Sequence, residues 1–400
     1  KQNKQNFVLE KKILNYNKIF LPIAYACLVA YFSFHYDIFS LRKPVIVAEE
    51  TPKAVTVDDR KFLTLSSWRS EDQKGMDRIL KVFNDHHQSP VRFDPIQDTR
   101  YRSTIETLLN NDLGPDLFYL DGNVASSKVI INNGHTMPLP EIPIDNLTID
   151  EKEAWTSNGV LQAVPVQAIA QGVYFNQNIF HELKLAIPKT WEEFLAIAHK
   201  IKNAGIIPLA NGIKDDWANA ELIFMSMAPN FIGGREGRIS YSQGKRCFND
   251  EHMVKLYQGI ASLSSMLPKN AKELSYYDGR QLFLDGKAAM WLSGSWELYF
   301  FNEIKPGFSF SVFMLPAPKG SKTTPIFHFD AAIAINSRTE NPKEAKEFIT
   351  WLLTPELKRL WQNELPGFFS LAPNAPKPEN KQAEHFLRLV KSFNNDVRWV

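Results

Sequence analysis

The feature that most constrains the fold of this chain is a repeated alternation between strand-like and helix-like segments. Short apolar or alternating runs predict strands, and apolar residues at helical spacing predict helices. In the first third of the chain the order is strand, helix, strand, helix, strand, at residues 62–65, 70–84, 91–96, 101–109 and 116–120. This alternation predicts an α/β fold whose functional residues lie near the carboxyl ends of the strands.

The same signals recur through the rest of the chain. Thr190 and Glu193 form a capping box, which predicts a helix from Trp191 to near Gly205. Further strands are expected at residues 163–166, 172–176, 206–210, 288–292, 310–315 and 331–335. Further helices are expected at residues 219–228, 250–263, 277–284 and 342–353. The sequence shows no internal repeat and no low-complexity block.

Composition excludes several classes of protein. The 400 residues include 46 Lys+Arg and 44 Asp+Glu, and 44% of them are hydrophobic, as in an ordinary globular protein. Because the formal charge is only +2 and both signs are interspersed, we expect no nucleic-acid partner. The two cysteines, Cys27 and Cys247, are far apart, so neither a metal cluster nor a disulfide framework is available. The length allows two or three domains of about 150 residues each.

The start of the chain differs from the rest. Residues 1–18 carry five lysines, and residues 19–39 are mostly apolar, with one histidine and one aspartate near the far end. A spanning helix needs about 17–25 residues. We therefore predict a cytoplasmic basic segment and a signal anchor or transmembrane helix within residues 1–44, oriented by the positive-inside rule. Cleavage ahead of Cys27 with lipidation is the alternative, and residues 45–57 are expected to be a linker.

Motifs for catalysis and metal binding are missing from the sequence. It contains no H-E-x-x-H, C-x-x-C, G-x-S-x-G, Walker loop or G-x-G-x-x-G. The adjacent histidines His86 and His87 follow a helix end, where a solvated turn is the simpler interpretation than a metal site. Adjacent carboxylates such as Asp215 and Asp216 do not form the facing pair that a glycosidase needs. We therefore expect no catalytic residue, no metal and no cofactor.

The positive signal is a set of aromatic residues at or just beyond predicted strand ends, with acidic residues near them. Flat rings stack on the C–H faces of sugars, while carboxylates bind sugar hydroxyls. Each ring alone is more often a core residue, so their shared position carries the prediction. The candidate ligand-binding residues are Trp68, Glu71, Asp72, Asp98, Tyr119, Asp121, Trp217, Trp291, Trp296, His328, Phe329 and Asp330. Trp217 and Trp296 are the best stacking candidates, whereas Trp191, in the first turn of a capped helix, should be structural.

Several short motifs stand in an order that matches a known family. They are Phe62 to Trp68, Gly114-Pro115-Asp116-Leu117, Tyr174-Phe175-Asn176, Pro188 to Phe194, Gly286 to Met290, Gly294-Ser295-Trp296, Asn341 to Ala345, and Leu365 to Phe368. With these motifs, residues 61–399 resemble the extracellular solute-binding proteins of family 1, the maltose-binding-protein-like sugar receptors of bacterial ABC importers. The sequence departs from the family at residues 326–330, where a glycine-rich stretch is usual.

The resemblance implies a type II periplasmic binding protein fold. Two lobes, each a mostly parallel sheet flanked by helices, would close on a ligand between them. Lobe 1 would comprise residues 58–167 and 329–371, and lobe 2 residues 168–328 and 372–400. Because chains of the family continue with further helices, we expect lobe 2 to be truncated at its C-terminus.

The resemblance also implies a function. We expect a membrane-tethered, extracytoplasmic monomer that binds a sugar or oligosaccharide without transforming it and delivers it to the permease subunits of an ABC transporter. One alternative is a carbohydrate-active enzyme with an aromatic groove, which would release product from oligosaccharides. The other is a ligand-sensing partner of a membrane receptor, whose closed form would dock on that receptor.

Overall fold

The computed structural model describes residues 62–399, apart from residues 123, 146, 148 and 371–374. The basic segment, the apolar helix and the linker that we expect at the start of the chain lie outside the described residues. Among the residues that are described, no helix combines the length and the apolar character needed to cross a bilayer.

Within the described residues, eight strands form a mixed sheet in the order β2-β1-β3-β10-β6-β8-β7, with β9 paired to β6 beside this path. They are β1 (Leu63–Ser66), β2 (Val91–Phe93), β3 (Leu117–Asp121), β6 (Val164–Asn176), β7 (Ile207–Leu209), β8 (Ala288–Gly294), β9 (Phe310–Phe313) and β10 (Phe327–Ile335). A separate hairpin pairs β4 (Thr156–Ser157) with β5 (Val160–Leu161). The pairs made by β1 and the β7–β8 pair are parallel, whereas every pair made by β6 or β10 is antiparallel. The expectation of mostly parallel sheets is therefore wrong, because the two longest strands run against their neighbours.

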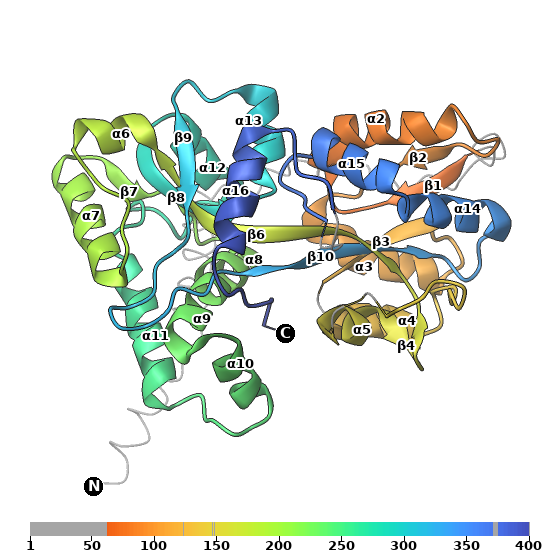
Figure 1. Ribbon diagram of the computed structural model, residues 1–400, viewed down its shortest axis with the longest axis horizontal. Coiled ribbons are helices and arrows are strands. Elements are labelled where there is room, and N and C mark those ends of the chain that lie inside the picture. Colours follow the sequence, from red (N-terminus) through yellow and green to blue (C-terminus); the bar gives the residue numbers. More distant parts are fainter. Residues whose placement is uncertain (1–61, 123, 146, 148, 371–374, 400) are drawn as a thin grey trace, which may run out of the picture. The chain divides into compact units, whose positions relative to one another are not determined.

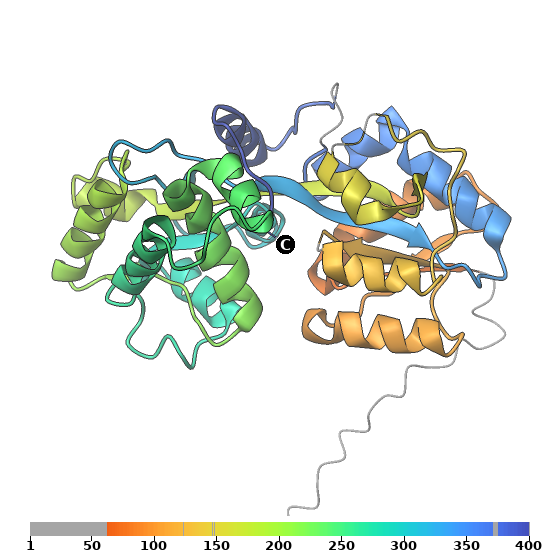
Figure 2. The same cartoon turned by 90° about the horizontal axis from the view of Figure 1, so that it is seen from below.

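Strands β6 and β10 join two groups of strands. Residues 164–170 of β6 pair with β10, and residues 171–176 pair with β8 and β9. The second half of β10, residues 331–335, pairs with β3. Figures 1 and 2 show both strands running between the two groups. We call β1–β3 with their helices the β1–β3 region, and β7–β9 with theirs the β7–β9 region.

Each region has its own helices. Those of the β1–β3 region are the 3-10 turn η2 (Ser70–Asp72), α2 (Gln73–Asn84), α3 (Asp98–Asn110), α4 (Val124–Asn132), α5 (Ile149–Trp155), α14 (Pro342–Leu352) and α15 (Pro355–Glu364). Those of the β7–β9 region are α6 (Gln177–Glu182), α7 (Trp191–Asn203), α8 (Asp216–Ala218), the π-helix η3 (Asn219–Met225), α9 (Ser226–Ile232), α10 (Gly234–Ser242), α11 (Glu251–Leu263), α12 (Tyr276–Leu284), α13 (Glu297–Ile304) and α16 (Lys381–Lys391). The predicted lobe boundaries, after Gln167 and His328, fall on β6 and β10, and the division into lobes stays a prediction.

Local signals predicted some helix starts and missed others. The Thr190 hydroxyl accepts a hydrogen bond from the Glu193 backbone at the start of α7, as predicted, and the helix is followed by Gly205 at a φ of +80°. Residues 70–72, which were expected to begin a helix, form a 3-10 turn without a side-chain cap, and α2 begins at Gln73. The strands expected at residues 163–166 and 172–176 are one strand, β6, whose buried glutamines interrupt the apolar pattern.

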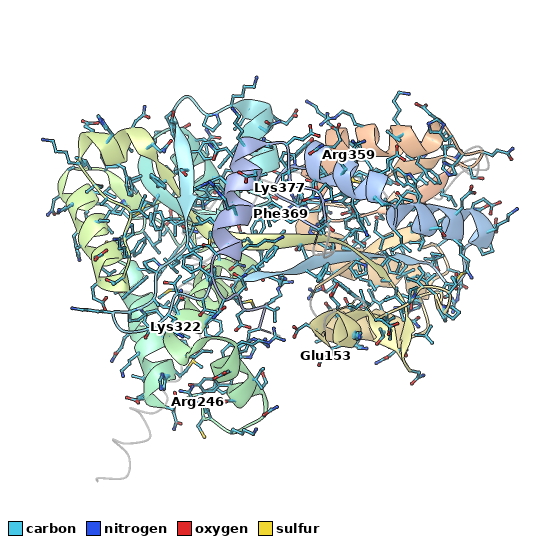
Figure 3. The ribbon with its side chains drawn as sticks, viewed as in Figure 1. Glu153, Arg246, Lys322, Arg359, Phe369 and Lys377 are labelled. Carbon is cyan, nitrogen blue, oxygen red and sulfur yellow. The ribbon has the colours of Figure 1, made fainter. Side chains whose placement is uncertain are left out.

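The loop after α15 contacts the middle of β6, where the two regions meet. Gly367 has a φ of +101°, and a Cβ at this position would lie 1.9 Å from the carbonyl oxygen of Ser295, so only glycine fits. Two residues further on, Phe369 exchanges backbone hydrogen bonds of 2.7 and 2.8 Å with Ala168. Phe369 is fully buried and lies beside β6 in Figure 3. The loop therefore anchors β6 at the predicted boundary between the lobes.

Candidate functional site

Ten of the twelve residues predicted to bind a ligand lie in three places on the structure. After β1 and at the end of β3 lie Trp68, Glu71, Asp72 and Asp121. On β10 lie His328, Phe329 and Asp330. In or next to β8 and α8 lie Trp217, Trp291 and Trp296. Tyr119 is inside β3, and Asp98 begins α3 with its side chain outside the described residues.

Carboxylates from two of these places, Asp121 and Asp330, are close enough to raise the pKa of nearby arginines. Burial lowers the pKa of the Arg398 guanidinium, and the Glu221 carboxylate raises it. Asp121 and Asp330 raise it further, so that this pKa lies above its ordinary value. For Arg69, burial again lowers the pKa, and neighbouring carboxylates, Asp330 among them, raise it by more. Asp330 on β10 therefore lies within electrostatic range of both the β1 end and the C-terminal segment.

Asp72 forms a bidentate ion pair with Arg69. The Nε and Nη2 atoms of Arg69 donate to the two carboxylate oxygens of Asp72, each at 3.0 Å. Asp72 is buried, and burial raises the pKa of its carboxyl while Arg69 lowers it. Because both oxygens already accept hydrogen bonds, we assign Asp72 to holding Arg69 in place, which differs from its predicted role in ligand binding.

Two of the aromatic candidates lie in the core. Trp291 is 0% exposed, and its ring centroid lies 5.2 Å from that of Tyr276 and 6.1 Å from that of Phe283. Tyr119 is also buried, its hydroxyl lies 3.9 Å from the sulfur of Met76, and burial raises its pKa well above the ordinary value. Both strands that carry these residues are covered on both faces, so a side chain on either face enters the core. We therefore assign Trp291 and Tyr119 structural roles, contrary to the prediction.

Trp217 and Trp296 share a neighbour, Tyr276, that the sequence analysis missed. The rings of Trp217 and Tyr276 are 4.8 Å apart, and Nε1 of Trp296 donates to the Tyr276 hydroxyl at 2.7 Å. Trp217 is 38% exposed, whereas Trp296 is only 8% exposed. The sequence feature that could have indicated Tyr276 is the capping box of Ser275 and Asp278, which starts α12 at this tyrosine. Of these three rings, Trp217 presents the open face.

A buried carboxylate completes this cluster. The Tyr276 hydroxyl donates to Glu297, which is 1% exposed. Burial raises the pKa of Glu297 to about 7, although Arg280 and Tyr276 act to lower it. Nη1 of Arg280 lies 3.6 Å from Oε2 of Glu297, and its Nη2 donates to Oε1 of Glu71 at 2.8 Å. Neither Arg280 nor Glu297 was predicted, because a charged residue on a helix normally faces solvent.

The crossing of β6 and β10 carries polar atoms with unused hydrogen-bonding capacity. Nε2 of Gln167 donates to Oδ2 of Asp330 at 2.7 Å, while Oε1 of Gln167 is buried without a hydrogen-bond partner in the described part of the chain. Nε2 of His328 is likewise buried without a hydrogen-bond partner there, and it lies in ion-pair range of Glu221, 3.6 Å from Oε1. A β-bulge between Phe329 and Ala331 interrupts the pairing of β10 with β6 at Asp330. Such donors and acceptors suit the hydroxyl groups of a polar ligand.

Glu221 is a further residue that the sequence analysis missed. It lies in the π-helix η3, where the sequence predicted an ordinary helix. Nε of Arg398 donates to its Oε2 at 2.7 Å, and Nε2 of Gln171 donates to its Oε1 at 2.9 Å. Although burial raises the pKa of Glu221, Arg398 and His328 lower it to about 2. π-helical turns often accompany functional sites, but no local pattern in the sequence signals one.

Three other predicted residues are only partly buried. Trp68 meets the rings of two tyrosines edge-on, at 5.5 and 5.6 Å, and Phe329 meets Trp155 in the same way at 5.8 Å. Asp121 pairs with the exposed Arg102. Within the described residues, no three His, Cys, Asp or Glu side chains are grouped as metal ligands. The predicted residues that are described offer aromatic rings and hydrogen-bonding groups.

Known proteins are similar to this chain over long stretches of sequence. A model of the bacterial extracellular solute-binding protein family matches residues 67–359. The multiple sugar-binding protein of Streptococcus mutans serotype c is 28% identical over 205 residues, which are 49% of this chain and 48% of that protein. The matched part of the chain therefore spans about half the length of this curated relative.

Solved structures share the fold. The solute-binding protein RafE in complex with raffinose superimposes with a TM-score of 0.70 and 23% identity, covering 84% of this chain and 89% of that chain. A chain solved in a study of xylan utilisation by the thermophilic bacterium Caldanaerobius polysaccharolyticus has a TM-score of 0.73 and 18% identity. The match covers 85% of this chain and 90% of that one. At these identities the likeness establishes the α/β fold with its mixed sheet and flanking helices.

Proposed function

We propose that this chain, which belongs to the family of bacterial extracellular solute-binding proteins, captures a sugar or oligosaccharide and delivers it to an ABC importer. The names of its relatives support a saccharide, since one is a multiple sugar-binding protein and another binds raffinose. The family is one of extracellular solute-binding proteins, so we propose that the chain captures its ligand without transforming it chemically.

Two observations carry the proposal, an exposed ring in the β7–β9 region and hydrogen-bonding atoms where β6 and β10 cross. Trp217 offers a half-open ring next to Tyr276. Asp330, Gln167 and His328 supply acceptors and donors on the crossing strands themselves. Aromatic faces and hydrogen-bonding groups are the two kinds of contact that bind sugar rings.

The position of these residues supports binding by closure. The proposed lobes, residues 58–167 with 329–371 and residues 168–328 with 372–400, meet on β6 and β10. A ligand that contacts both lobes stabilises the closed arrangement by its preference for that arrangement. We propose that the closed, monomeric protein is the form that the permease recognises.

The N-terminal segment supports a tether. Residues 1–18 are basic and residues 19–39 are mostly apolar, which is the pattern of a membrane anchor with its basic end in the cytoplasm. We propose that this segment holds the binding domain at the outer surface of the cell membrane. Recovery of the protein in the membrane fraction would support the tether, and a mature soluble form that begins near Glu49 would contradict it.

Replacing Trp217 by alanine should weaken saccharide binding by about 1–3 kcal/mol, because a stacked ring buries apolar surface against the sugar. Trp217 is partly exposed, so the fold should tolerate the change. Titration calorimetry with a panel of neutral oligosaccharides that includes raffinose measures the effect.

Trp191 provides the matched control. It is 6% exposed and stacks on Phe194 at 5.3 Å within the β7–β9 region, so Trp191→Ala should reduce stability and leave affinity unchanged in the folded protein. The site would be wrongly placed if Trp217→Ala and Trp296→Ala both kept full affinity for every ligand while Trp191→Ala abolished binding.

A further inference from the structure

An ion pair joins the two regions next to the aromatic cluster. Nη2 of Arg280, on α12, donates to Oε1 of Glu71, in η2, at 2.8 Å, although the residues are 209 positions apart in the chain. The Arg280 side chain is 10% exposed and that of Glu71 is 29% exposed. The pair is thus shielded from solvent more than an ordinary surface salt bridge, and its electrostatic strength is correspondingly greater.

Arg280 is held from its own side independently of Glu71. Its guanidinium carbon lies 3.8 Å from the ring centroid of Phe300 and 4.8 Å from that of Tyr277, which are cation–π contacts. Its Nη1 atom lies 3.6 Å from Oε2 of Glu297. All three neighbours belong to the β7–β9 region. The guanidinium therefore has three contacts within its own region, and its hydrogen bond to Glu71 reaches the β1–β3 region.

Two other contacts between the regions differ from this pair. The backbone N–H of Gly75 donates to the Tyr299 hydroxyl at 3.1 Å in a buried contact that carries no charge. Arg235 on α10 pairs with Asp150 on α5 at 2.8 Å, but these side chains are 39% and 32% exposed. The second pair resembles the first in geometry and differs from it in exposure, so it offers a matched comparison.

We propose that the Glu71–Arg280 ion pair is a closing contact, which raises saccharide affinity by stabilising the arrangement in which both regions contact the ligand. This inference rests on the proposed function. Arg280 is a positioning residue in this scheme, since it acts through the arrangement of the two regions and does not touch the ligand. The apparent affinity of a closing protein is its intrinsic affinity multiplied by the fraction of molecules that are already closed, so a contact that raises this fraction raises affinity.

The first test compares Glu71→Gln with Asp150→Asn. Each variant removes one charge from one pair between the regions and keeps the shape of the side chain. With the tightest-binding neutral oligosaccharide of the panel, Glu71→Gln should weaken binding about tenfold, because it removes the carboxylate charge that strengthens the shielded hydrogen bond to Arg280. Asp150→Asn should change affinity less than about twofold, since exposed pairs contribute little. Equal effects of the two variants would overturn the proposal.

A double-mutant cycle separates the ion pair from direct contact between Glu71 and the ligand. The cycle combines Glu71→Gln with Arg280→Gln in a Glu297→Gln background, so that no buried carboxylate is left without its arginine. If the ion pair is responsible, Glu71→Gln has no further effect on affinity once Arg280 is replaced. An unchanged loss of affinity in that background would show direct contact with the ligand and would overturn the proposal.

A measurement without ligand keeps the inference separate from the proposed function. Spin labels are attached at Lys81→Cys on α2 and Lys200→Cys on α7, two exposed positions, in the full chain with both natural cysteines replaced by serine. Pulsed electron paramagnetic resonance should show longer distances in Glu71→Gln than in the parent protein, and unchanged distances in Asp150→Asn. Unchanged distances in both would overturn the closing contact. If no saccharide binds the parent protein, the proposed function fails while the distances still decide the inference.

Discussion

Trp291→Ala is expected to lower the free energy of unfolding by about 3–5 kcal/mol, the cost typical of truncating a large buried aromatic side chain. The indole is 0% exposed in the middle of β8, and four rings lie around it, with centroids between 5.2 and 6.3 Å away, those of Tyr276, Phe283, Phe301 and Tyr174. Alanine leaves a cavity that this packed group of rings cannot fill. Denaturant unfolding followed by circular dichroism measures the loss.

The control for this variant is Trp217→Ala. Trp217 lies close to the same tyrosine, at 4.8 Å, but it is 38% exposed, so its loss should cost much less stability. The two tryptophans thus separate a core role from a binding role. Weakened saccharide binding by Trp291→Ala at unchanged stability would return Trp291 to the binding site and refute its structural assignment.

Stability should depend on pH through Glu297. Burial raises the pKa of this carboxyl from the usual 4.5 to about 7 in the folded protein. Between these values the folded state holds a proton that the unfolded state has released, so stability falls as pH rises. The contribution is fully present below about pH 4.5 and is lost as pH rises through about 7, for a total of about 3 kcal/mol at 1.36 kcal/mol per pKa unit.

Glu297→Gln should remove this dependence, since the amide carries no titrating proton. The variant and the parent protein are unfolded with denaturant at several values between pH 5 and pH 8, and the difference between them isolates Glu297. Glu221 does not interfere, because its pKa of about 2 means that its contribution is present above the unfolded value of 4.5 and is lost only as pH falls toward 2. If the free energy of unfolding falls with pH equally in the two proteins, a group other than Glu297 causes the decline.

The candidate site shows which inferences local sequence supports. Trp217 was predicted from its place in a loop after a strand, and the structure puts it next to Tyr276 with an open face. Trp291 was predicted by the same kind of placement, but it lies in the core. A sequence pattern shows where a strand ends, and it does not show which side chains are covered when helices pack on both faces of the sheet. Every residue of β8 is buried, so no alternation distinguishes its faces.

The sequence by itself determined the features that depend on neighbours along the chain. The strand–helix alternation indicated the α/β class, the ordered motifs indicated the family, and the hydroxyl of Thr190 marked the start of α7. Each of these is a short-range signal, in which a capping side chain bonds to the next turn or an apolar period reports one buried face. Such signals can be recognised in the sequence without knowing the path of the chain.

Only the tertiary structure decided which distant groups meet. Glu71 and Arg280 are 209 residues apart, Glu221 and Arg398 are 177 apart, and Gln167 and Asp330 are 163 apart. The mixed sheet brings them together because β6 and β10 pass through both groups of strands. Burial then sets their chemistry, since the same carboxyl group has a pKa of about 7 at Glu297 and about 2 at Glu221. That difference comes from desolvation and from the positions of arginines far away in the sequence, which no local pattern encodes.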